Sequence, residues 1–215
     1  QQVIFVNQTE KQALLTILIQ EEQIDRALVF TRTKHGADRV VKLLAGNGIA
    51  SNAIHGNKSQ PQRERALAAF KSGEVPILVA TDIAARGIDI SGVSHVFNFE
   101  LPNVAEQYVH RIGRTARAGA SGIAVAFCAD DERPYLKDIE KLTRQKVPVR
   151  ALPADFMKRA DALKAARIKA IGNDPAPRED RPRQQRGPAR PKATHQPTAT
   201  RDYANACLLY TSDAA

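Results

Sequence analysis

The sequence has few cysteines and no long hydrophobic run, and each shortage excludes a class of protein. Only two of its 215 residues are cysteine, Cys128 and Cys207, too few for a disulfide framework or a cysteine metal cage. No apolar run approaches the roughly 20 residues that span a bilayer, so we expect no membrane segment. The first ten residues lack the pattern of a secretory signal, and we expect a cytoplasmic protein.

The common motifs of nucleotide-binding enzymes, serine hydrolases and metalloproteases are also missing. The sequence contains no G-x-x-x-x-G-K-[ST] phosphate loop, no G-x-G-x-x-G, no G-x-S-x-G and no H-E-x-x-H. The five histidines and two cysteines are not grouped at metal-binding spacings. We therefore expect that this chain does not bind and activate a nucleotide by itself.

Positive charge is in excess and is concentrated in the C-terminal part. Lys and Arg number 32 against 23 Asp and Glu, a formal net charge of +9. This balance is compatible with a polyanionic partner, and an incidental basic surface is the alternative. Residues 151–215 carry 12 basic and 7 acidic groups, whereas residues 1–150 carry 20 and 16. More than half of the excess thus lies in the shorter segment.

These shifts in composition predict three parts. Residues 1–150 form the folded domain, and residues 151–171 form a basic helix that buries little, because its apolar residues are mostly alanine. Residues 172–215 are a Pro/Arg-rich tail with few large apolar residues, so its ordering entropy is not offset and we expect disorder. The last ten residues are unusually apolar, which raises the question of whether they belong to the native reading frame.

Strands and helices are predicted to alternate along residues 1–150. Short apolar runs predict strands near residues 3–6, 27–30, 49–54, 77–80, 95–99 and 122–128. Helical periodicity follows near residues 14–19, 37–44, 59–70, 104–112 and 130–142. This alternation is typical of a doubly wound α/β fold with a mostly parallel sheet, which binds ligands at the carboxyl ends of its strands.

The densest functional signal lies at residues 108–119. Arg111, Arg114 and Arg117 follow at intervals of three, so a continuous helix would place them on one face. Three guanidinium groups with no carboxylate among them repel one another, and a phosphate-rich ligand would relieve that repulsion. A solvated basic face is the alternative.

Two further segments end predicted strands. After residues 77–80, the hydroxyl of Thr81 can contact a phosphate, and the carboxylate of Asp82 can accept a hydrogen bond from a ribose hydroxyl. The alternative is that Asp82 is only the N-cap of a helix. In the second segment, Gly56 permits close backbone approach, and Arg63 lies near a helix N-terminus that can face an anion.

Together these segments resemble the second, C-terminal RecA-like domain of DEAD-box RNA helicases. Residues 29–33 (VFTRT) resemble motif IV, residues 55–70 the following HG…Q..R segment, residues 79–90 motif V, and residues 108–119 motif VI. Glu100 replaces the aspartate of an Asn-aromatic-Asp-Leu-Pro run. The basic tail resembles that of bacterial RhlE-like members. The match runs from about residue 1 to 142.

The resemblance implies roles for individual residues. Arg114 and Arg117 match the arginines that reach the γ-phosphate of ATP, with Arg117 as the arginine finger, and Asp89 matches the ribose contact. Gly87 matches a further ATP-binding residue. The remaining roles are coupling between the two RecA-like domains, by Arg86, His110 and Arg111, and sequence-independent contacts to the RNA backbone, by Thr33, Gly56, Arg63 and Thr81.

The resemblance also implies an ATP-dependent RNA helicase as the parent enzyme. The family's N-terminal RecA-like domain, which holds ATP and Mg²⁺, is missing from this sequence, so we expect the chain alone to be inactive. A non-enzymatic RNA-binding module is the rival hypothesis, and it makes Arg114 and Arg117 dispensable. A bare nucleotide-binding domain would require the phosphate loop that the sequence lacks.

Overall fold

The described residues form a six-stranded, entirely parallel sheet with helices on both faces. The computed structural model describes residues 1–22, 24–86, 88, 93–115 and 122–172, the last six of these by backbone alone. The sheet order is β1-β6-β5-β2-β4-β3. Its strands are β1 (Gln2–Phe5), β2 (Ala27–Thr31), β3 (Ser51–Ile54), β4 (Ile77–Thr81), β5 (His95–Asn98) and β6 (Ile123–Cys128). This topology confirms the predicted doubly wound α/β fold.

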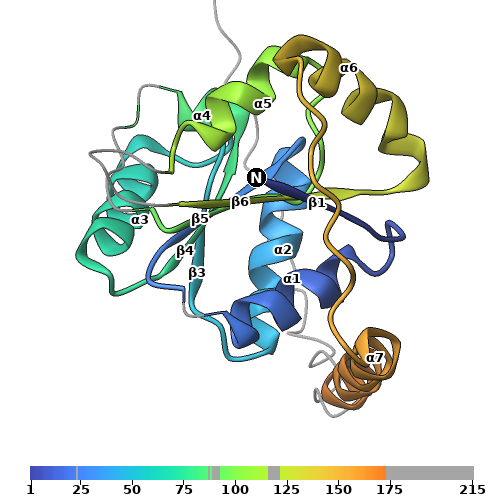
Figure 1. Ribbon diagram of the computed structural model, residues 1–215. Coiled ribbons are helices and arrows are strands. Elements are labelled where there is room, and N and C mark those ends of the chain that lie inside the picture. Colours follow the sequence, from blue (N-terminus) through green and yellow to red (C-terminus); the bar gives the residue numbers. More distant parts are fainter. Residues whose placement is uncertain (23, 87, 89–92, 116–121, 173–215) are drawn as a thin grey trace, which may run out of the picture. The chain divides into compact units, whose positions relative to one another are not determined.

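Two layers of helices cover the sheet, as Figure 1 shows with α5 and α6 on one side of β6 and α1 on the other. The helices are α1 (Lys11–Glu21), α2 (Lys34–Gly46), α3 (Gln60–Ser72), the short α4 (Asp82–Ala85), α5 (Ala105–Ile112), α6 (Arg133–Thr143) and α7 (Phe156–Gly172), with a 3-10 turn η1 (Asp130–Glu132) before α6. Buried residues of α1, α2 and α7 pack on one face, and those of α3 to α6 on the other.

Local sequence explains where these elements begin and end. Strand β2 is buried at all five positions, because it lies inside the sheet and is covered on both faces. Thr33 caps α2 by accepting a hydrogen bond from the backbone N–H of Gly36 at 3.0 Å. Helix α3 begins with a capping box between Ser59 and Gln62 and ends at Gly73, whose φ of +82° favours glycine.

The two edges of the sheet differ. Val3 of β1 bonds to the segment after α6: its N–H donates to the carbonyl of Pro148 at 2.9 Å and its carbonyl accepts from the N–H of Arg150 at 2.8 Å. The segment therefore covers the β1 edge. At the other edge, the strand pairings of the described residues join β3 only to β4.

Helix α7 is packed more closely than its composition predicts. Phe156 is 3% exposed and Ala160 is fully buried, and both belong to the hydrophobic cluster that contains α1. The expectation that this helix buries little was therefore wrong at its first turns. Contacts divide the chain into Gln1–Asp174 and Pro175–Ala215, and all described residues lie in the first unit. No helix among them is long and apolar enough to cross a membrane.

Candidate functional site

The predicted site residues gather where the parallel strands end. Thr33 follows β2, Gly56 follows β3, Asp82 follows β4 and Glu100 follows β5. Because these strands are parallel and adjacent, their carboxyl ends lie at the same edge of the sheet. The sheet thus brings together motifs that are far apart in the sequence.

Arg111 is a buried anchor of this edge. It is 1% exposed, and its Nε and Nη2 donate to the two carboxylate oxygens of Asp82 at 2.6 and 2.7 Å. Its Nη1 donates to Asn98 Oδ1 at 3.1 Å and to the carbonyl oxygen of Glu100 at 2.7 Å. The guanidinium also lies 5.2 Å from the ring centre of Phe30. Arg111 therefore ties α5 to the ends of β4 and β5.

The arrangement differs from the single arginine face that the spacing predicted. Helix α5 ends at Ile112, and Arg111 points inward to Asp82. Arg114 lies beyond the helix end, and its Nη1 donates to the carbonyl oxygen of Ile88 at 3.0 Å. The repulsion expected between the arginines is thus relieved for Arg111 by a carboxylate of the chain itself.

A small pocket lies beside Arg111. Its walls include the exposed side chains of Arg86 and His110 and the half-buried Arg114. The free volume is about 20 Å³, room for roughly one water molecule. With Arg111 itself, this pocket brings four of the predicted ATP and coupling residues together, but it does not enclose a nucleotide.

Three of the predicted residues lie outside the described part of the chain. They are Gly87, Asp89 and Arg117, the proposed nucleotide contacts and the arginine finger. Of the residues predicted to bind ATP or to couple the domains, the structure therefore describes Arg86, His110, Arg111 and Arg114.

The four predicted RNA contacts follow β2, β3 and β4, the three strands nearest one edge of the sheet. Thr33 and Thr81 occupy the N-cap positions of α2 and α4. Asp82, the other candidate for the N-cap of α4, is instead the first residue of that helix. Gly56 is exposed, and a Cβ there would meet nothing within 4 Å. Arg63 donates from Nη2 to the carbonyl of Ala84 at 3.5 Å, and so reaches from α3 to α4.

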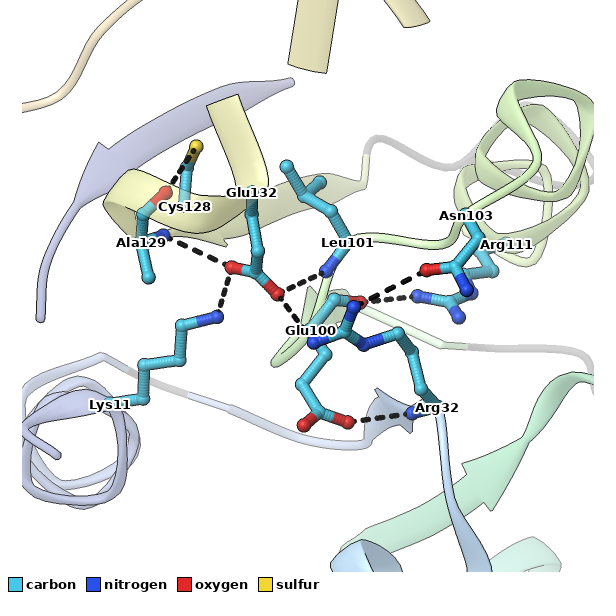
Figure 2. A network of polar contacts seen from close by, with 9 residues as sticks. All are labelled: Lys11, Arg32, Glu100, Leu101, Asn103, Arg111, Cys128, Ala129 and Glu132. Carbon is cyan, nitrogen blue, oxygen red and sulfur yellow. Dashed lines mark hydrogen bonds and ion pairs between the residues drawn. The ribbon is translucent and has the colours of Figure 1, made fainter. Parts of the chain in front are cut away.

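A second buried network, centred on Glu132, fixes the ends of β5 and β6 (Figure 2). Its carboxylate is fully buried, pairs with the equally buried Lys11 of α1, and lies 3.5 Å from the guanidinium of Arg32. The same carboxylate accepts from the backbone N–H of Ala129 at 3.0 Å and of Leu101 at 3.3 Å. Glu132 therefore joins four separate chain segments.

The sequence analysis did not identify Lys11 or Glu132. Glu132 lies in an acidic run and Lys11 at the start of a helix, both places where charged residues are usually exposed. Their pairing could not be read from spacing, because 121 positions separate them.

Burial also affects two neutral groups of the same core. It raises the pKa of Tyr108 to about 12 and, together with the charge of Glu132, raises the pKa of Cys128 to about 11. Both side chains are therefore uncharged at neutral pH.

Comparison with known proteins adds the family. Residues 9–119, just over half of the chain, match the model of the helicase conserved C-terminal domain. The chain belongs to this family.

The relatives of this helicase C-terminal domain include bacterial RNA helicases. It is 46% identical over 149 residues to the ATP-dependent RNA helicase RhlB of Vibrio campbellii, which covers 69% of the chain and 34% of the relative. It is 47% identical over 144 residues to CshA of Limosilactobacillus reuteri, covering 67% and 28%. The chain thus spans about a third of the length of these relatives. The match to RhlE-like members stays a prediction.

Solved structures agree with this assignment. The domain superposes on the Escherichia coli DEAD-box protein SrmB, solved with the regulator of ribonuclease activity A, with a TM-score of 0.67 and 36% identity, covering 70% of this chain and 89% of that one. It superposes on Saccharomyces cerevisiae Dbp5 bound to RNA and ADP BeF3 with a TM-score of 0.66 and 30% identity, covering 77% and 45%. The domain is therefore the C-terminal RecA-like domain of the DEAD-box type.

Proposed function

We propose that this chain supplies the C-terminal half of the active site of an ATP-dependent RNA helicase. The observation that carries the proposal is the grouping of Arg86, His110 and Arg114 around one pocket at the carboxyl ends of the strands. In this proposal the N-terminal RecA-like domain, in the same polypeptide, provides the other half. Hydrolysis of ATP between the two domains drives local unwinding of RNA duplexes.

The charge and shape of the pocket suit one side of a phosphate chain. Guanidinium groups donate several hydrogen bonds in a fixed plane and stay charged, which matches phosphate oxygens. Arg114 and Arg117 would stabilise the charge that develops on the γ-phosphate, and Gly87 and Asp89 would contact the nucleotide. A pocket of this size agrees with a site that closes only when two domains meet.

Mg²⁺, which accompanies ATP, is assigned to the other domain. Among the residues that the structure describes, no three His, Cys, Asp or Glu side chains are grouped as metal ligands. The donor set of this pocket is mostly cationic and does not suit a metal ion. We therefore derive no step of the reaction from a metal on this chain.

Arg111 contributes to coupling in an indirect way. Its guanidinium is committed to Asp82, Asn98 and Glu100. We propose that it holds α5 against α4, so that His110 and Arg114 on one side and Arg86 on the other keep fixed positions for the partner domain. Arg111 is then a positioning residue.

RNA is proposed to lie across the ends of β2, β4 and β3. Thr33, Gly56, Arg63 and Thr81 would contact its sugar-phosphate backbone, which carries no sequence information in itself. The relative Dbp5 has been solved with RNA, which supports RNA as the ligand class. Binding is then independent of RNA sequence.

The proposal can be tested by fusing this chain to the N-terminal domain of the Vibrio campbellii relative. We expect ATP hydrolysis that RNA stimulates, and a large loss of turnover in an Arg114→Ala variant that still binds RNA. Arg133→Ala is the matched control, because Arg133 is exposed on α6 and pairs with Asp130. An active fusion that Arg114→Ala leaves unchanged would instead favour the RNA-binding module without catalysis.

A further inference from the structure

His55 is an almost fully buried histidine in the loop that carries Gly56. Its side chain is 2% exposed, and Nε2 lies 3.0 Å from Oδ1 of Asp38 on α2. Its Nδ1 lies 3.3 Å from the backbone nitrogen of Asn57. A backbone N–H can only donate, so Nδ1 accepts, and Nε2 carries the hydrogen that is donated to Asp38. Each ring nitrogen therefore has a defined partner.

Two further contacts hold the same loop on α2. Lys58 Nζ lies 3.0 Å from Oδ1 of Asp38, and Lys34 Nζ donates to Oδ1 of Asn57 at 3.0 Å. Desolvation acts to raise the pKa of Asp38, but the hydrogen bonds from His55 and Lys58 outweigh it and lower that pKa. Asp38 is therefore a stable anion at neutral pH, and residues 55–58 are fixed beside the N-terminus of α2.

We propose that His55, through Asp38, is a positioning residue that presets Gly56 to contact the RNA backbone. The proposal rests on the proposed function, in which Gly56 is such a contact. Gly56 is exposed, and a Cβ there would meet open space, so a ligand backbone can approach it closely. Without the contacts of its neighbours, a glycine would sample many backbone conformations. Fixing the loop before RNA binds removes part of the ordering cost that would otherwise weaken binding.

The alternative is that His55 only fills space in the fold. Three substitutions separate these roles. His55→Leu removes both hydrogen bonds of the imidazole ring, to Asp38 and to the backbone N–H of Asn57. His55→Gln places an amide nitrogen near the position of Nε2, so it keeps the donor to Asp38, whereas His55→Asn keeps an acceptor near Nδ1 but is too short to reach Asp38. Positioning through Asp38 requires that the Gln variant retain RNA binding better than the Asn variant.

His95 provides a matched control at the amino-terminal end of a strand in the same sheet. It is 6% exposed at the start of β5, and its Nε2 lies 3.2 Å from Oε2 of Glu22, with Nδ1 2.9 Å from Ser94 Oγ. His95→Leu therefore also removes a buried histidine–carboxylate pair. It does so far from the carboxyl ends of the strands, where the RNA contacts are proposed.

The experiment is a titration of the isotope-labelled full chain with a single-stranded oligouridylate, followed by NMR at the backbone amides of residues 55–58. Reading these amides separates binding at the loop from binding elsewhere on the chain. Urea unfolding of each variant measures stability in parallel. Because His55→Leu is the variant most prone to misfold, Asp38→Asn, at a position 42% exposed, is a second probe of the same link.

We expect His55→Leu and His95→Leu both to lower stability, but only His55→Leu to weaken binding at the loop, by about three- to tenfold, as loss of one useful hydrogen bond implies. Asp38→Asn should weaken it in the same direction, and His55→Gln should remain within about twofold of the unaltered chain. Equal affinities for His55→Leu, Asp38→Asn and the unaltered chain would overturn this inference alone. If RNA left the loop amides of the unaltered chain unshifted, both the RNA contact of the proposed function and this inference would be overturned.

Discussion

Arg111 and Asp82 form a two-point ion pair between the end of α5 and the start of α4, with nitrogen–oxygen distances of 2.6 and 2.7 Å. Asp82 belongs to the segment that resembles motif V, and Arg111 to the one that resembles motif VI. The pair therefore joins the two segments that are proposed to contribute most of the nucleotide contacts. The pair thus fixes the position of one segment relative to the other.

Loss of this pair should destabilise the domain strongly. Asp82→Ala leaves the buried Arg111 charge without its carboxylate, and we expect a loss of about 3 kcal/mol in the free energy of unfolding. Urea denaturation measures it. Arg133→Ala, which breaks an exposed pair with Asp130, should cost less than about 1 kcal/mol. Because the double variant Asp82→Ala/Arg111→Met leaves no unpaired charge, it should recover part of the loss. Equal costs for Asp82→Ala and Arg133→Ala would contradict the anchoring role.

Arg117 should be essential for hydrolysis in the fusion with an N-terminal domain. Arg117→Ala should lower turnover by about 10³–10⁵-fold while RNA affinity changes little, because an arginine finger acts on charge that develops in the transition state. Arg117→Lys should fail as well, since an ammonium group cannot replace the forked donors of a guanidinium. Steady-state ATPase assays with saturating RNA decide this; turnover within about tenfold of the unaltered fusion would exclude the finger role.

The chain by itself should show no RNA-stimulated ATP hydrolysis. Its sequence contains no phosphate loop, and the pocket beside Arg111 holds only about 20 Å³ of free volume. A phosphate-release assay with purified chain, ATP, Mg²⁺ and RNA measures this, with the fusion as positive control. Robust turnover that survives further purification would show that the chain is more than half of an active site.

The Pro/Arg-rich tail should bind RNA through charge alone. Residues 178–201 carry seven basic and two acidic groups. Deleting the residues after Ile171 should weaken binding to single-stranded RNA and flatten its salt dependence, by about 0.7 in the log–log slope for each lost phosphate contact. The melting temperature of the folded domain should be the same with and without the tail, because we expect the tail to bury almost nothing. Titrations of both forms at several salt concentrations provide the measurement, and superimposable slopes would mean that the tail does not contact RNA.

Glu22 should make stability depend on pH in the acid range. A hydrogen bond from His95 lowers its pKa below the ordinary value of 4.5; burial opposes this, and Arg150 adds to the lowering. Because the pKa of Glu22 is lower in the folded than in the unfolded chain, its ionised carboxylate stabilises the fold fully above pH 4.5. This stabilisation is lost as the pH falls through the folded-state pKa. Glu22→Gln should thus be less stable than the unaltered chain at pH 7, and the gap should close in acid. Urea unfolding at several pH values tests this, and a gap that stays constant down to pH 3 would contradict it.

Much of the fold could be predicted from local sequence. Apolar runs such as residues 77–80 and helical periodicity such as that near residues 37–44 are properties of neighbouring residues, and they gave the alternation of strands and helices. Motif order then gave the family, which the comparisons confirm. Helix α7 shows the limit of this reasoning, because its alanine-rich composition did not reveal that Phe156 and Ala160 are buried beside α1.

The sequence by itself determined the parallel α/β class and which segments lie at the carboxyl ends of the strands, because both follow from hydrophobic patterning and the connection rules for parallel strands. Only the tertiary structure decided the partners of the charged residues. Arg111 pairs with Asp82, Lys11 with Glu132 and His55 with Asp38 across 29, 121 and 17 positions. Such pairs form where the crossovers bring segments together, and burial then makes an unpaired charge too costly.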